Sequence, residues 1–287
     1  MQAIFFAILS YIGWGSGDLF ATIAARKVGP YSATFWFIFL QLLITLPFGI
    51  FFLDDLNRIT IRLVILTLSL AVLGNIGLIT FYKGVQIGNA ALVGSISASF
   101  IVLTVILSIV FLNESVTLSQ TASMIIIFIG VIIASLDLKE IKLKKSVLNK
   151  AVIYGLVSML TWGVYWTFIK IPVREINWFW PSIIASSSFP LVYLFMRIAK
   201  IELKSANHKN AFTPLLANSA LISFGSLSYY YAISKGLIAV VAPIAGSYPT
   251  LFVLLAFLFF KDKITKQQIV GIVTTLVGIV LLSVFSV

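Results

Sequence analysis

Long apolar blocks, each about twenty residues in length, follow one another along almost the whole chain, with short polar connections between them. A helix of about twenty apolar residues crosses the hydrocarbon core of a bilayer. The longest polar stretch, Asp137 to Lys150, falls halfway along the chain and is predicted to be a linker. The pattern predicts ten membrane-spanning helices, over residues 3–25, 31–53, 63–82, 90–112, 118–136, 150–170, 178–197, 211–234, 238–260 and 267–286.

The composition excludes a water-soluble domain. Hydrophobic residues make up 60% and charged residues 10% of the 287 residues, whereas a soluble domain carries about 25% charged residues. The net charge of +11 is better explained by basic cytoplasmic loops than by a nucleic-acid partner. The chain has no cysteine, and its one histidine, His208, lies in a polar loop, so we expect no disulfide and no thiolate metal site.

The two halves of the chain match at many positions at an offset of 148 residues, beginning with Trp14-Gly15 and Trp162-Gly163. The register slips in the second segment, where Pro47 matches Pro190. We interpret the offset as a duplication of a five-helix unit, with repeats at residues 1–136 and 150–287 joined by a cytoplasmic basic linker at 137–149. Because five is odd, the second copy enters the membrane from the opposite side. The predicted fold class is an all-α membrane protein with ten transmembrane helices arranged as two inverted five-helix repeats. Further matched pairs are Tyr82 and Tyr230, Gly88 and Gly236, Phe111 and Phe259, Gln120 and Gln268, and Gly130 and Gly278.

The distribution of basic residues predicts an orientation. With ten spans, the side that holds both termini has 5 Lys and Arg residues and the other side has 15. Cytoplasmic loops carry the excess of Lys and Arg. The count therefore predicts termini outside the plasma (inner) membrane and a linker in the cytoplasm, provided that the number of spans is ten.

Two five-helix copies, each opening with a Trp-Gly pair, resemble the drug/metabolite transporter superfamily of the EamA type. The endings are similar too: Ser-Ile-Val-Phe-Leu-Asn-Glu-Ser-Val-Thr at 108–117 and Phe-Leu-Phe-Phe-Lys-Asp-Lys-Ile-Thr at 257–265 each precede a glycine-bearing helix. The resemblance implies transport of small metabolites or drug-like amines, commonly export of amino acids. It also implies a kink at Tyr248-Pro249, whereas the matching Phe100-Ile101 has no proline, and cytoplasmic termini, which opposes the charge count.

Enzyme chemistry has little support in the sequence. There is no Gly-x-x-x-x-Gly-Lys-Ser/Thr phosphate loop, so the chain itself does not use ATP, and no His-Glu-x-x-His. Gly13, Gly15 and Gly17 lie in a spanning segment, where closely spaced glycines allow another helix to approach. We therefore predict no enzyme activity, no cofactor and no metal.

Asp18 is the only acidic residue predicted to lie deep inside an apolar segment. A carboxylate in hydrocarbon costs several kcal/mol unless it has a partner or a role, which favours a functional residue. The alternative is a carboxylate satisfied by neighbouring hydroxyls or a Trp N–H, or neutralised. Asp18 is also the candidate coupling residue.

We predict an aromatic-walled cavity with scattered hydroxyls and amides, near the midplane where the copies meet. Trp14 and Trp162 could equally fill a helix interface, and at most two of the three tyrosines at 229–231 can face one side of a helix. The candidate substrate-binding residues are Trp14, Asp18, Asn75, Tyr82, Ser97, Trp162, Tyr165, Trp166, Ser226, Tyr230, Ser247 and Tyr248.

Charged residues near segment ends are given structural roles. Lys170 is expected to be an interfacial anchor, with contact to an anionic substrate as the alternative. Glu114 and its repeat mate Asp262 are expected to stabilise the start of the helix that follows each, together with Thr117 and Thr265.

The favoured function is secondary active transport of a small metabolite or drug-like solute, an amino acid or organic amine, across the plasma membrane by alternating access. Proton coupling or exchange would drive it. The expected partners are a small-molecule substrate and membrane lipids, without nucleic acid, in a monomer or weak homodimer. The alternative is a non-transporting membrane scaffold or lipid-handling partner protein, which predicts a closed midplane. An intramembrane enzyme is the weakest reading, because no paired catalytic groups occur within the spans.

Overall fold

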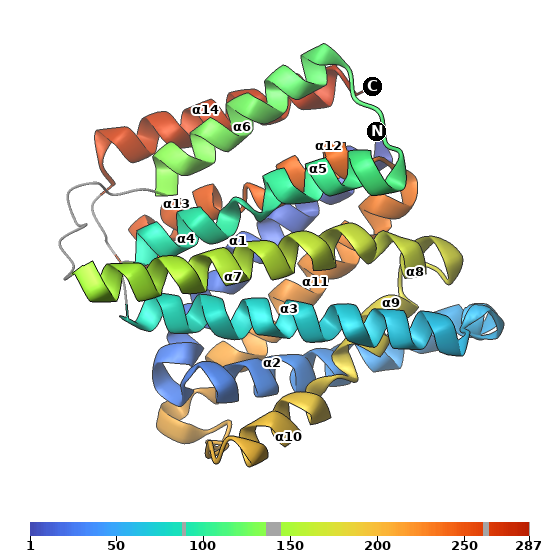
Figure 1. Ribbon diagram of the computed structural model, residues 1–287, viewed down its shortest axis with the longest axis vertical. Coiled ribbons are helices and arrows are strands. Elements are labelled where there is room, and N and C mark those ends of the chain that lie inside the picture. Colours follow the sequence, from blue (N-terminus) through green and yellow to red (C-terminus); the bar gives the residue numbers. More distant parts are fainter. Residues whose placement is uncertain (88–89, 136–144, 261–263, 287) are drawn as a thin grey trace.

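The computed structural model describes residues 1–87, 90–135, 145–260 and 264–286, and all regular structure in that part of the chain is helical (Figure 1). Residues 137–144 of the predicted linker lie outside the described residues, and 145–149 already belong to a helix. In chain order the elements are α1 (Gln2–Val28), α2 (Pro30–Thr45), η1 (Leu46–Arg58), α3 (Ile61–Ile87), α4 (Ala90–Ala98), α5 (Phe100–Leu112), α6 (Leu118–Ser135), α7 (Lys145–Phe168), α8 (Lys170–Glu175), α9 (Trp180–Ser186), α10 (Phe189–Ile198), η2 (His208–Asn210), α11 (Phe212–Lys235), α12 (Ile238–Gly246), α13 (Pro249–Phe260) and α14 (Lys266–Val284).

Helices occupy each of the ten predicted ranges, and several of them are interrupted. Within the described residues, 8 helical stretches are long and apolar enough to cross a membrane. Two predicted spans fall outside that group. One contains the shorter apolar helix Ile96–Leu112. The other is α11, which is long but carries an asparagine, several serines and three tyrosines. A count of ten crossings therefore stays a prediction, while an all-helical protein with multiple apolar spans is established.

The polarity of α11 fits its position, because much of the helix is buried against other helices rather than facing lipid. It packs along α1, while α3 packs along α7 and α6 along α14 (Figure 1). Polar groups at membrane depth are tolerated where protein covers them. The low hydropathy of α11 thus marks a central helix.

Equivalent positions in the two halves make equivalent close contacts. A Cβ on Gly225 of α11 would lie 2.6 Å from Cδ1 of Trp14, and a Cβ on Gly77 of α3 would lie 2.5 Å from Cδ1 of Trp162. Both pairs are related by the 148-residue offset. Each Trp-Gly helix therefore packs against the third helix of the other half, at a glycine that gives the indole room.

Two helical rods are interrupted at matching places. A turn at Ser99 (φ −64°, ψ −7°) separates α4 from α5, and a turn at Ser247-Tyr248 separates α12 from α13. The second break precedes Pro249, as the resemblance implied. The first has no proline and occurs nevertheless, so a break at this place does not require proline.

The predicted contribution of Thr117 and Thr265 to helix starts is confirmed. Thr265 Oγ1 accepts from the backbone N–H of Gln268 (3.2 Å), and the Gln268 side chain accepts from the backbone N–H of Thr265 (2.9 Å). Thr117 and Gln120 form the same reciprocal pair at the same two distances. These capping boxes satisfy N–H groups at the first turns of α14 and α6.

We expect Thr265→Ala to lower the free energy of unfolding by about 1 kcal/mol, because the cap hydrogen bond is lost. Denaturant titration of the purified protein in detergent measures the change. Thr274→Ala is the matched control, since Thr274 lies inside α14 and its hydroxyl bonds to the carbonyl of Val270 in its own helix. Equal effects of the two variants would contradict the capping role.

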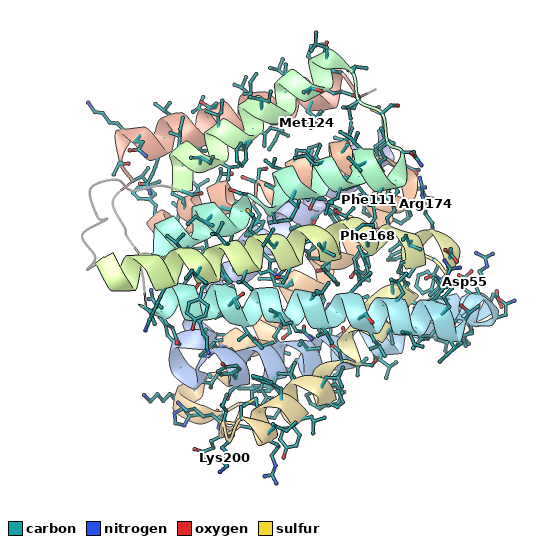
Figure 2. The ribbon with its side chains drawn as sticks, viewed as in Figure 1. Asp55, Phe111, Met124, Phe168, Arg174 and Lys200 are labelled. Carbon is teal, nitrogen blue, oxygen red and sulfur yellow. The ribbon has the colours of Figure 1, made fainter. Side chains whose placement is uncertain are left out.

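Both chain termini lie at one end of the helical rods, which is also the end reached by η1 and α8 (Figure 1). Figure 2 shows Asp55 and Arg174 at this end. Asp55 there pairs with Arg58 (3.2 Å) and accepts a hydrogen bond from Asn177 (2.8 Å). Charged side chains at the ends of the rods are what a bilayer requires of helices that cross it.

Candidate functional site

A cavity of about 120 Å³ lies among the central helices. Its walls come from α1, α2, α3, α5, α7, α9, α11 and the break between α12 and α13, so both halves of the chain contribute. The volume holds several water molecules but is smaller than the roughly 300 Å³ of a drug-sized site. In this conformation the cavity suits a small solute.

The structure brings ten of the twelve predicted site residues to the cavity wall: Trp14, Asp18, Asn75, Tyr82, Trp162, Tyr165, Trp166, Ser226, Tyr230 and Tyr248.

Ser97 and Ser247 do not line the cavity, although both are buried. The Ser247 hydroxyl donates to the carbonyl of Ile244 (2.7 Å), so its own helix uses it at the α12–α13 break. Of the three tyrosines at 229–231, only Tyr230 reaches the cavity. Tyr229 is buried beside it, and its hydroxyl donates to the carbonyl of Trp166 (3.2 Å).

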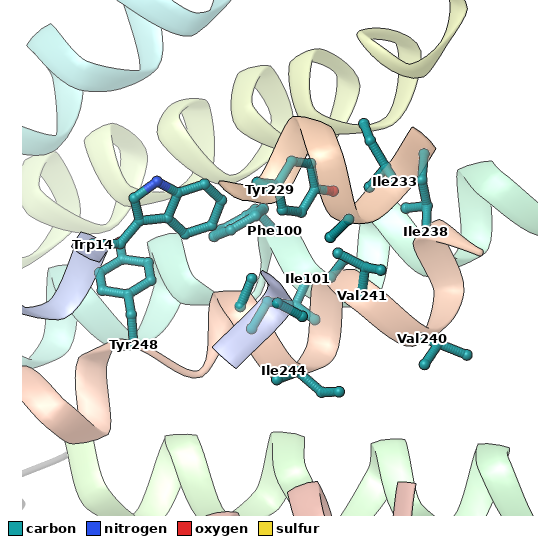
Figure 3. Close-up of a cluster of buried hydrophobic side chains, with 14 of the residues drawn as sticks. Trp14, Phe100, Ile101, Tyr229, Ile233, Ile238, Val240, Val241, Ile244 and Tyr248 are labelled. Atoms are coloured by element: carbon teal, nitrogen blue, oxygen red, sulfur yellow. The ribbon is translucent and has the colours of Figure 1, made fainter. Parts of the chain in front are cut away.

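One side of the cavity is an aromatic wall built from both halves. The ring centroid of Trp166 lies 4.6 Å from that of Trp14 and 4.7 Å from that of Tyr165. Trp14 also meets Tyr248 edge to face at 5.9 Å. Figure 3 shows Trp14 and Tyr248 next to each other at one end of a buried cluster whose far end holds Ile233 and Ile238. Contacts of this geometry add stability beyond the area they bury and fix the ring orientations.

The indole N–H groups of the two Trp-Gly pairs are both satisfied. Trp14 Nε1 donates to Ser226 Oγ (3.2 Å), and Trp162 Nε1 donates to the carbonyl of Gly74 (3.2 Å). The two alternatives considered for these tryptophans are thus compatible, because each one fills a helix interface and also lines the cavity.

Asp18 lies one helical turn from Trp14 on α1, and its half-buried side chain lines the cavity. Tyr248 and Tyr82 also line the cavity, and both are close enough to the Asp18 carboxyl group to interact with it electrostatically. A carboxyl group beside tyrosines and other aromatic rings can accept a proton or pair with an ammonium group.

Part of the cavity lining is polar, and sequence reasoning missed most of these residues. Ser182 and Ser186 come from α9, Asn218 from α11 and Gln41 from α2. Asn75, which was predicted, joins them from α3, and its amide donates to Ser188 Oγ (3.0 Å). The four-residue spacing of Ser182 and Ser186, and an asparagine in an apolar helix, were the signals available in the sequence.

The expectation for Glu114 was wrong. Its carboxylate does not serve the start of α6 but accepts from the backbone N–H groups of Ile238 (2.9 Å) and Ala239 (2.8 Å) at the start of α12. A carboxylate at a helix N-terminus is stabilised by the helix dipole. Glu114 has this role at α12 and not, as predicted, at α6. Asp262, its repeat mate, lies outside the described residues.

Lys170 is not an interfacial anchor. Its side chain is 1% exposed and forms an ion pair with Glu114, which is 3% exposed, and it also donates to the carbonyl of Gly236 (2.8 Å). This buried cluster joins the end of α5, the start of α8, the end of α11 and the start of α12. Asp18 is therefore one of two acids inside the helical body of the described chain, not the only one.

Comparison with known proteins identifies the family. The chain matches the EamA-like transporter family over residues 1–136 and 149–284. The protein MJ1333.1 of Methanocaldococcus jannaschii is 29% identical over 140 residues, which are 48% of this chain and 98% of that protein. The transporter YojE of Bacillus subtilis is 30% identical over 143 residues, which are 46% of this chain and 47% of YojE.

A solved structure described as "Crystal structure of protein" shares the fold, with a TM-score of 0.80, 11% sequence identity and coverage of 99% of this chain and 98% of the other. The family is one of transporters rather than enzymes, and the helices of this chain suit a bilayer. The chain belongs to the EamA-like transporter family and is a multi-pass membrane transporter of the drug/metabolite type.

Proposed function

We propose that the protein is a secondary active transporter in the plasma membrane that moves a small metabolite, an amino acid or organic amine, by alternating access. The observation that carries the proposal is the cavity itself, with Asp18 in a wall shared by both halves of the chain. A scaffold or lipid-handling protein predicts a closed midplane instead, and the cavity favours transport over that alternative.

An inverted duplication of five helices, at residues 1–136 and 150–287, gives an alternating-access transporter two conformations, each open to one side of the membrane. The matched Trp-Gly contacts, the matched helix breaks and the matched capping boxes support the duplication. The alignment with MJ1333.1 covers 48% of this chain and 98% of that protein, which is the length expected of one repeat. Ten spans with both termini outside remain part of the proposal.

Asp18 is the proposed coupling residue, as a proton site or as the counter-ion of an ammonium group. The titratable groups that face it are Tyr248, from the α12–α13 break, and Tyr82 of α3. If a substrate ammonium and a proton compete for the same carboxylate, movement of one drives the other in the opposite direction.

We expect Asp18→Asn to abolish accumulation of substrate driven by a pH gradient, because the amide binds neither a proton nor a cation. The measurement is uptake into proteoliposomes with and without a pH gradient, after a thermal-shift screen against amino acids, polyamines, nucleosides and sugars has found a ligand. Asp54→Asn is the control, since Asp54 is exposed. Unchanged, fully pH-coupled transport by Asp18→Asn would remove Asp18 from the mechanism.

A further inference from the structure

Three polar side chains at the cavity wall are buried without a hydrogen-bond partner among the described residues. They are the Oγ atoms of Ser182 and Ser186 and the Oδ1 atom of Asn218. Each of these residues is 2% exposed, and each lines the cavity. Most buried polar groups in proteins are satisfied, and an unsatisfied one is costly to maintain. Three of them in the lining of one cavity are explained if a ligand supplies the missing partner.

The charge of the cavity restricts the kind of ligand. Asp18 is the only charged residue among the described residues of the lining, which includes no lysine or arginine. An ammonium group therefore has a counter-ion and aromatic faces close by. A carboxylate would have no cation, and it would share a small low-dielectric space with the carboxylate of Asp18.

The helix breaks near the cavity do not replace the missing cation. Half-helix N-termini can hold a substrate carboxylate when their N–H groups are free. Here the N–H groups of Ser247, Tyr248 and Thr250 donate to the carbonyls of Ile244, Ala245 and Ser247. At the other break, Ser99 N–H donates to Ile96 and Val102 N–H to Ser99. These N–H groups are therefore not free to bind a substrate carboxylate.

We propose that Ser182, Ser186 and Asn218 form a specificity wall for an uncharged hydrogen-bonding group, and that the substrate is an amine cation carrying an amide or hydroxyl rather than an amino-acid zwitterion. The ammonium pairs with Asp18 and the aromatic wall, and the amide or hydroxyl binds the two serine hydroxyls and the asparagine. This inference rests on the proposed transport function and narrows its substrate class.

The test compares three ligands of similar size that differ at one end. Valinamide has an ammonium and an amide, valine has an ammonium and a carboxylate, and isovaleramide has the amide without the ammonium. Isothermal titration of the purified protein in detergent gives each Kd. We expect valinamide to bind about tenfold or more tightly than either of the others.

The variant Ser182→Ala/Ser186→Ala tests the wall directly. We expect it to weaken valinamide binding about tenfold, because two hydrogen bonds to the ligand are lost. It should fold normally, since the hydroxyls that it removes have no hydrogen-bond partner in the part of the chain that the structure describes. Ser10→Ala is the matched control, because Ser10 Oγ is also buried and unpartnered but does not line the cavity.

Equal or tighter binding of valine, or unchanged valinamide affinity in the double serine variant with a normal melting temperature, would overturn the inference. Failure of all three ligands to bind would also overturn the inference. Transport of another solute in proteoliposomes would then leave the transporter function standing. Failure of the function itself would be seen separately, as the absence of transport of every solute found in the thermal-shift screen.

Discussion

Lys170→Met is expected to destabilise the protein by about 3–5 kcal/mol, because the substitution leaves the Glu114 carboxylate buried without its cation. Glu114 and Lys170 are 3% and 1% exposed, so water cannot replace the lost partner. Among the described residues, the backbone N–H groups of Ile238 and Ala239 would remain as its hydrogen-bond donors. Denaturant titration in detergent, followed by tryptophan fluorescence, measures the change in unfolding free energy.

Arg62→Met is the matched control, because Arg62 also pairs with a glutamate, Glu175, but at 3.9 Å and with side chains 75% and 44% exposed. An exposed pair of this kind contributes about 0–1 kcal/mol. The double variant Glu114→Gln/Lys170→Met removes both charges and should recover part of the loss. Similar effects of Lys170→Met and Arg62→Met would show that the buried pair is not needed for stability.

Gly13→Ala is expected to lower the unfolding free energy by about 1–3 kcal/mol, because one added methyl group overpacks the α1–α11 interface. A Cβ at Gly13 would lie 2.6 Å from Cα of Gly225 and 2.8 Å from the carbonyl oxygen of Leu221. These are backbone atoms, so the two helices must separate to make room. The same titration in detergent measures the effect.

Gly94→Ala provides the opposite result as a control. Gly94 lies within α4, and a Cβ added there meets no described atom within 4 Å. Alanine favours a helix over glycine by roughly 0.5–1 kcal/mol, so this variant should be unchanged or more stable. Equal losses in the two variants would mean that glycine at position 13 is not required for close packing.

The positions of the helices follow from the sequence because length and apolarity decide which segments a bilayer accepts. The 148-residue offset also relates close contacts that the structure shows. It paired Trp14 with Trp162, and the structure gives each a glycine partner on a helix of the other half. Periodicity and repeat matching are properties of the chain itself, so no tertiary information was needed.

The polar residues of the cavity lining and the buried Glu114–Lys170 pair depend on tertiary contacts, which cannot be read from the sequence. Ser182 and Ser186 lie in the second segment of their repeat, where the register slips. The 148-residue offset therefore does not pair them with residues of the first half. Glu114 lies at the end of its segment, where a surface position is the better prediction. Only packing against Lys170, 56 positions later, places it in the interior.

The crossed pairing of α1 with α11 and of α3 with α7 has a consequence for biosynthesis. Trp14 and its acceptor Ser226 are 212 residues apart, so α1 is made long before the surface that it fits. While the intervening segments enter the bilayer, the glycine face of α1 has only lipid or temporary neighbours. The central core can thus form only after the ribosome has produced α11. Neither half of the chain can complete its own packing alone.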